Sequence, residues 1–289
     1  MGRKRRIATW TGTILGIALA VLVNVALAHG AEAVASEEFH QIYPLSASGR
    51  IELSNINGDV RITAWDQNQV KVDAIKRAED QDDLKSMEIR VDSRPDSLSI
   101  ETKYHQNNDE SWSRGRHHGG AVEYTLTVPR NARLDEIKLI NGALHIAGIN
   151  GEVHASWING KLTATGLGSR AALQTINGPL EASFDRLEKS AIELSSVNGP
   201  VRLTLPSDVK AHIEATTVHG GIDNNFGLHV NNHRWVGHDL TGELGNGGAD
   251  IHLRNVNGTV EIRHADDGRA LSPAHNSHGG DQGGDDDTI

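Results

Sequence analysis

An Asn-Gly corner, repeated along the chain, constrains the fold more than any other feature. Each copy has an aliphatic residue before Asn-Gly, any residue after it, and then Leu or Val. The seven copies are Asn57-Gly58, Asn141-Gly142, Asn150-Gly151, Asn159-Gly160, Asn177-Gly178, Asn198-Gly199 and Asn257-Gly258. Asn-Gly readily supplies the positive φ of a tight turn between strands. The repetition therefore predicts an all-β chain of strands joined by one recurring turn.

The spacing of the corners favours a solenoid. Asn141, Asn150 and Asn159 are nine residues apart, Asn177 follows after 18, and Asn198 and a weaker copy at His219-Gly220 follow after 21 each. Such a period predicts a single-stranded β-helix whose coils of about 18–21 residues have two strand-bearing sides. A β-sandwich is the alternative, although its turns would not need to share one sequence.

The segments that follow the corners at 141, 150 and 159 align without gaps. The alignment predicts that Leu144, Val153 and Leu162 stack in the interior. It also predicts that His145 and His154 face water on neighbouring coils.

The first 33 residues have the features of a secretory signal. A basic cluster at 3–6 precedes an apolar stretch at 7–28, and small residues end at Ala28 and Ala33. An uncleaved membrane anchor is the competing interpretation, since about twenty apolar residues can span a bilayer. Both interpretations predict that the rest of the chain is exported to the periplasm or cell envelope.

Composition excludes several classes of function. The chain has no cysteine, which rules out disulfides, a thiol nucleophile and zinc–thiolate sites. Its formal net charge is −10 and becomes more negative once the basic start is removed. Such a surface repels nucleic acid and anionic lipid. We therefore expect no nucleic-acid partner, and membrane contact only through the N-terminal segment if that segment is not cleaved.

Residues 38–264 are predicted to form one elongated β domain. Alternating strands are expected at 51–53, 60–64, 70–72, 89–91, 98–100 and 122–128, with a short helix at 80–87. The pattern is interrupted near 105–120 and 224–246, which indicates insertions. Residues 265–289 are an acidic, polar tail that is expected to be disordered.

The repeated Ile-Asn-Gly corners, the strand from Tyr124 to Pro129 that leads into Asn141, and the exported start resemble the bacterial putative-adhesin families of unknown function, including the head GIN domains. The resemblance covers residues 38–264. It implies a single-stranded β-helix at the cell envelope. It implies no established chemistry, and no catalytic residue is carried over with it.

One loop carries the predicted binding residues, which are Trp112, Arg114, Arg116, His117 and His118. A basic island with an aromatic side chain is unusual on an acidic protein, and binding residues concentrate on loops. We expect this loop to contact an anionic envelope partner, either a polysaccharide or a protein. Trp157 is a weaker candidate for such contacts, because its position favours packing.

Metal binding and catalysis have less support. Loop histidines could ligate a transition metal, but the carboxylates near them are scattered, so neither a metal site nor a cofactor is predicted; the histidines are His117, His118, His229, His233 and His238.

Polysaccharide-active β-helix enzymes need two or three convergent carboxylates. Here Asp59, Glu152 and Glu181 fall at turns and strand edges without a local cluster. The sequence therefore predicts a noncatalytic module for adhesin-like binding or scaffolding. A polysaccharide-active enzyme and a metal-binding envelope protein are the alternatives.

Overall fold

The computed structural model describes residues 35–105, 120–187, 189–233 and 237–276. The predicted signal at 1–33 and the predicted binding loop lie outside these ranges. Within the described residues, no helix has both the length and the apolar character needed to span a bilayer.

Two long β-sheets contain all the strands of the described residues. Sheet A has ten strands in the order β1 (Ala35–Pro44), β4 (Gln69–Ala78), β7 (Ala121–Pro129), β3 (Val60–Trp65), β9 (Leu144–Ala147), β11 (Leu162–Leu167), β13 (Leu180–Phe184), β15 (Val201–Leu205), β21 (Val260–His264) and β17 (Ile222–Asn224). Sheet B has the order β18 (Asn231–Asn232), β19 (His238–Leu244), β16 (Ala211–His219), β20 (Ala249–Asn257), β14 (Ala191–Asn198), β12 (Ala171–Asn177), β10 (Val153–Asn159), β8 (Arg133–Asn141), β2 (Arg50–Asn57), β6 (Ser97–Tyr104) and β5 (Met87–Arg94), and β22 (Ala274–Asn276) pairs with β19. The all-β prediction is confirmed.

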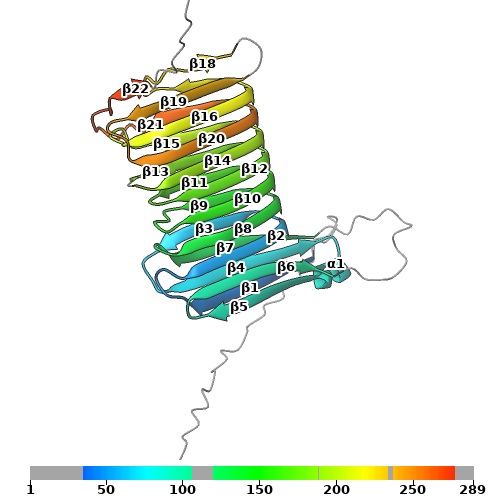
Figure 1. Ribbon diagram of the computed structural model, residues 1–289. Helices are drawn as coiled ribbons and strands as arrows, with labels where there is room; N and C mark the ends of the chain where they lie inside the picture. Colours follow the sequence, from blue (N-terminus) through cyan, green and yellow to red (C-terminus); the bar gives the residue numbers. More distant parts are fainter. Residues whose placement is uncertain (1–34, 106–119, 188, 234–236, 277–289) are drawn as a thin grey trace, which may run out of the picture.

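The central part of the molecule is a stack of coils (Figure 1). From β8 to β15 the chain alternates between the sheets, so each coil gives one strand to sheet B and the next to sheet A. Strands of successive coils pair in parallel, as in β10 with β12 and β11 with β13. This order is the one that a two-sided solenoid requires. We refer to it below as the coil stack.

The core lies between the sheets and consists of aliphatic columns. One column in sheet A contains Leu144, Leu162, Leu180, Val201 and Val260, each 0% exposed and each the register partner of the next. Burial of such a side chain contributes about 1.5–3 kcal/mol. Each coil is therefore held mainly by its two neighbours.

The predicted nine-residue stacking is wrong. Val153 lies in sheet B, where its partners are Leu134 and Ala171, and it does not stack on Leu144. His145 and His154 are likewise on opposite sheets. Nine residues make half a coil, so the structural repeat is the doubled period.

The order of coils in space differs from their order in the chain. β20 lies between β14 and β16, and β21 lies between β15 and β17. The register partner of Asn198 is therefore Asn257, and His219 follows as the partner of Asn257. The last coil of the chain fills a place inside the stack, as its colour in Figure 1 shows.

The N-terminal end of the stack is antiparallel. β1 pairs with β4, β4 with β7, and β5 with β6, all in antiparallel register. The predicted helix is confirmed as α1 (Gln81–Ser86), and the Asp80 side chain caps it by accepting bonds from the N–H groups of Asp82 and Asp83.

The tail differs from the prediction over residues 265–276. Residues 265–276 were expected to be disordered, yet β22 pairs with β19, and the Ser207 hydroxyl donates to the Ala265 carbonyl at 2.5 Å. Backbone pairing with a neighbouring strand orders this polar segment even though it contributes little to the core. Residues 277–289 lie outside the described ranges.

Candidate functional site

Six of the corners lie on one edge of the coil stack, where strands of sheet B pass into sheet A. Each asparagine is the last residue of its strand, and each following glycine has positive φ, from +117° at Gly58 to +145° at Gly258. Asn150-Gly151 is different. It lies between β9 and β10 on the opposite edge, and Gly151 is not among the glycines with positive φ. The sequence pattern alone did not distinguish the two edges.

The six corner asparagines form a ladder of side-chain hydrogen bonds. From Asn141 onward, each Nδ2 donates to the Oδ1 of the preceding asparagine in the ladder at 2.8–2.9 Å; in spatial order the members are Asn57, Asn141, Asn159, Asn177, Asn198 and Asn257. The glycine N–H groups donate in the opposite direction, as Gly160 does to the carbonyl of Asn177 at 3.0 Å. The ladder fixes the register of neighbouring coils at this edge.

Replacing Asn159 by aspartate should test the ladder. The variant loses the Nδ2 donor to Asn141 and places a carboxylate beside that residue's Oδ1, which should lower the free energy of unfolding by about 1 kcal/mol at pH 7. Repulsion raises the pKa of the carboxyl in the folded state above its unfolded value, so the loss should shrink as pH falls through the folded pKa. Urea unfolding at pH 7 and pH 4 measures both effects.

Asn150→Asp is the matched control, because among the described residues the side chain of Asn150 makes only one bond, a long one of 3.4 Å to Asn131. An equal loss in both variants would show that the ladder carries no special stability.

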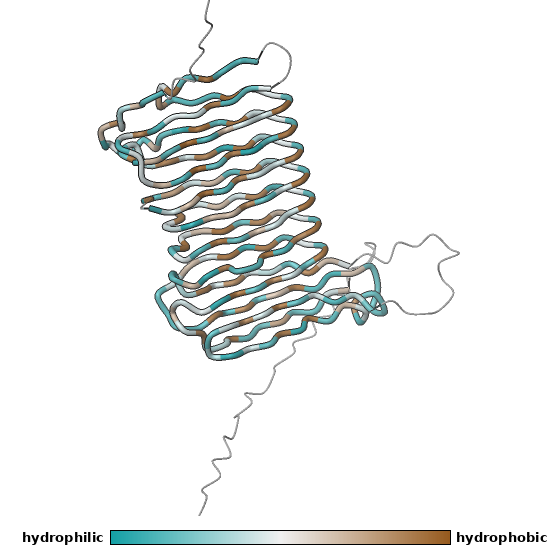
Figure 2. Tube along the Cα trace, in the orientation of Figure 1, coloured by the Kyte–Doolittle hydropathy of each residue, from teal (hydrophilic) through white to brown (hydrophobic). Residues whose placement is uncertain are grey.

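An exposed aliphatic row runs beside the ladder on the outer face of sheet B. It consists of the residue that precedes each ladder asparagine or His219, and its members are Ile56, Ile140, Ile158, Ile176, Val197, Val256 and Val218. Six of them are 37–44% exposed, and Ile158 is half-buried. Contiguous apolar surface rimmed by polar groups is typical of interaction sites. In Figure 2 the hydrophobic segments line up from coil to coil.

Strand geometry turns these residues outward. Side chains alternate between the two faces of a sheet. The preceding residue points inward in every coil, as Asn55 does at 2% exposure, with its Nδ2 donating to the Val122 carbonyl at 2.8 Å. Because the inner position is filled, the aliphatic residue must face solvent.

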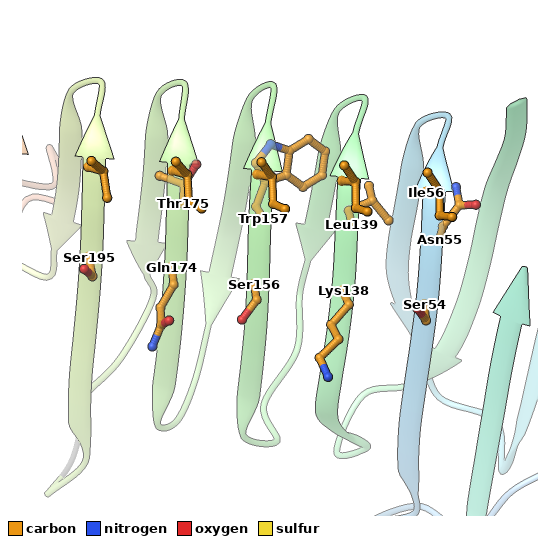
Figure 3. A pocket seen from close by; sticks show the side chains of 14 residues that line it. Ser54, Asn55, Ile56, Lys138, Leu139, Ser156, Trp157, Gln174, Thr175 and Ser195 are labelled. Carbon is orange, nitrogen blue, oxygen red and sulfur yellow. The ribbon is translucent and has the colours of Figure 1, made fainter. Parts of the chain in front are cut away.

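A polar row flanks the aliphatic row on its other side. Register partners place Ser54, Lys138, Ser156, Gln174, Ser195, Arg254 and Thr216 next to one another across seven strands. Five of these side chains are seen in Figure 3, in the groove of about 400 Å³ that they line with the aliphatic residues of β2, β8, β10, β12 and β14. The groove combines an apolar floor with hydroxyl, amide and ammonium groups.

The aliphatic row ends at charged strands. At one end the parallel register of β2 with β6 places Glu101 opposite Ser54, and Glu101 forms an ion pair with Lys103 at 3.3 Å. At the other end β19 brings His238 and Asp239 alongside β16. The apolar surface is therefore limited to seven strands.

Two surface carboxylates that form ion pairs have lowered pKa values. The Arg202 guanidinium holds the pKa of Glu261 below its usual value, and a hydrogen bond from His212 does the same for the pKa of Glu214. A general acid needs the opposite shift. These groups are suited to surface ion pairs.

The structure places the predicted site residues as follows. Trp112, Arg114, Arg116, His117 and His118 lie outside the described residues. Trp157 is 2% exposed, which confirms packing.

The late-insertion histidines do not converge. His233 contacts Asp239, His238 contacts Asn232 at 2.6 Å, and the backbone N–H of His229 donates to Asn276. No group of three metal-ligating side chains occurs in the part of the chain that the structure describes.

Comparison with known proteins gives structural neighbours only. No family model matches the chain, and neither does any curated protein. A putative cell adhesion protein from Clostridium sporogenes is 12% identical with a TM-score of 0.48, over 79% of this chain and 100% of that one. A putative adhesin from Bacteroides fragilis is 14% identical with a TM-score of 0.36, over 79% and 97%. A putative lipid binding protein from Parabacteroides distasonis is 8% identical with a TM-score of 0.28, over 79% and 96%. Neighbours of bacterial origin thus include putative adhesins, the class that the sequence resembles, but no functional inference rests on similarity this low.

Proposed function

We propose that this chain is an exported, noncatalytic binding module of the cell envelope, and that it binds its partner on the outer face of sheet B. The observation that carries the proposal is the aliphatic row, which lies between the asparagine ladder and the polar row. Neighbouring strands are about 4.8 Å apart, so seven strands give an apolar surface about 29 Å long. A surface of this shape suits an elongated partner.

The chemistry of the groove favours a protein segment over a polysaccharide. Its outward-facing apolar members are all Ile or Val, whereas Leu139 and Trp157 in its lining are buried. Aliphatic side chains complement the apolar side chains of a protein, and the hydroxyl and amide groups of Ser156 and Gln174 can bond to its polar groups.

A double substitution in the aliphatic row tests the proposal. Ile140→Ser with Ile176→Ser removes apolar contact from two strands of the groove, and binding to isolated cell-envelope fractions in co-sedimentation should fall at least tenfold. Both side chains are exposed, at 37% and 44%, so the free energy of unfolding should change by less than about 1 kcal/mol.

Leu271→Ser is the matched control, because Leu271 is 46% exposed but lies away from the row. Protease treatment of the envelope fraction should abolish the binding. Binding that survives protease but not glycosidase treatment would identify a polysaccharide partner, and unchanged binding by the double variant would exclude this face.

A further inference from the structure

The two ends of the coil stack differ in whether their strand edges and core are covered. At the C-terminal end, β19 pairs antiparallel with β16, and β18 and β22 pair with β19. Phe226 and Leu228 of the same insertion are 3% and 5% exposed. This insertion covers the core at that end, as a capping unit must in a repeat protein. The capped end is the upper one in Figure 1.

The N-terminal end has open strand edges. β1 is the last strand of sheet A and β5 the last strand of sheet B, with ten and eight residues. Among the described residues nothing pairs with the outer edge of either strand. α1 contacts both strands, yet Phe39, Tyr43, Ile89 and Val91 remain only partly buried. Long open edges beside apolar side chains are templates for pairing with another chain.

The charges on β5 are self-complementary. Its outward side chains alternate in sign, with Glu88, Arg90, Asp92 and Arg94. When β5 is aligned antiparallel to a copy of itself about Val91, Glu88 lies opposite Arg94 of the copy and Arg90 opposite Asp92. Opposite charges across an antiparallel pair stabilise it. The charge pattern of β5 therefore favours pairing with β5 of a second copy.

We propose that a second copy of this chain docks on the N-terminal end, with β5 pairing antiparallel to β5 of the partner copy across a twofold axis. The pairing would continue sheet B through both copies and bring the two β1 edges of sheet A together at the same junction. An isologous contact of this kind closes after two copies. The capped ends and the aliphatic rows would remain free on both copies.

Charge exchange on β5 tests the proposal. Sedimentation velocity of the full chain should show a dimer. R90E/R94E makes the outward face of β5 wholly acidic, E88R/D92R makes it wholly basic, and each variant alone should be monomeric at concentrations where the unmodified chain is dimeric. An equimolar mixture of the two variants should recover the dimer.

A dimer retained by both variants, or an unmodified chain that stays monomeric, would overturn the proposal. Failure of the mixture to recover the dimer would overturn the β5 register.

Disulfide trapping gives a second, independent readout. The chain has no cysteine, so V91C provides a single thiol at the centre of the proposed pair. Oxidation of V91C should give a covalent dimer, because facing Cα atoms in an antiparallel pair lie within disulfide range. T163C on the outer face of sheet A should not cross-link, and neither should V91C combined with R90E/R94E. Equal cross-linking of V91C and T163C would contradict the proposed contact.

Discussion

Gly178→Ala should lower the free energy of unfolding by about 4 kcal/mol, from backbone strain and overpacking together. Gly178 has φ of +131°, a region that L-residues rarely adopt. A Cβ there would lie 1.8 Å from the Gly160 carbonyl oxygen of the neighbouring coil, so one of the two coils must shift. Urea unfolding followed by circular dichroism measures the loss.

Three other glycines separate the two causes. Gly151→Ala has the close contact without positive φ, because its Cβ would meet the Ala132 carbonyl oxygen at 2.1 Å. Gly247→Ala has φ of +67° with open space, and Gly221→Ala has neither feature. The losses should rank Gly178 first, Gly151 and Gly247 between, and Gly221 near zero. A Gly178 variant as stable as the Gly221 variant would contradict both causes.

The corner sequence was sufficient to predict an all-β chain of two-sided coils, because a tight turn flanked by alternating strands is encoded locally. It was not sufficient to predict on which edge a corner lies. Asn150 shares its local sequence with Asn159, yet Asn159 bonds to Asn141 in the ladder and Asn150 does not. The difference arises from neighbouring coils. The corner between β10 and β11 lies beside other Asn-Gly corners, whereas the corner between β9 and β10 does not.

Pairings between distant segments were also beyond local sequence. β20 lies between β14 and β16, so Asn257 follows Asn198 in the ladder although 59 residues separate them. The coils share a similar alternation of apolar and polar residues and similar corner residues. The sequence pattern is therefore compatible with several spatial orders of the coils. The antiparallel end formed by β1, β4 and β5 has the same origin, because alternation does not specify strand direction.

The alternation of side chains along each strand is the sequence signal that indicates the aliphatic row. In β12, Ala171, Leu173 and Thr175 face the core, which leaves Ile176 on the outside. The local motif does not specify the face, because Ile149 before Asn150 is 0% exposed whereas Ile176 before Asn177 is 44% exposed. Its apolar character is conspicuous only when seven coils place it in one row.

Trp157→Ala should lower the free energy of unfolding by about 3–5 kcal/mol, the usual cost of deleting a buried tryptophan. Trp157 is 2% exposed and lies in sheet B between Leu139 and Thr175, its register partners. Its ring also lies beside the corner, since a Cβ on Gly160 would be 2.6 Å from Cζ2. The expected loss comes from the cavity in the stack, and urea unfolding measures it.

Trp157→Phe should cost less than about 1 kcal/mol, which separates packing from hydrogen bonding. The indole Nε1 is buried without a partner among the described residues. A buried donor without a partner costs about 1–3 kcal/mol, so its removal offsets much of the packing lost with the smaller ring. If Phe proves as destabilising as Ala, removal of the buried N–H does not offset the smaller ring, and the full size of the indole is what stabilises the stack.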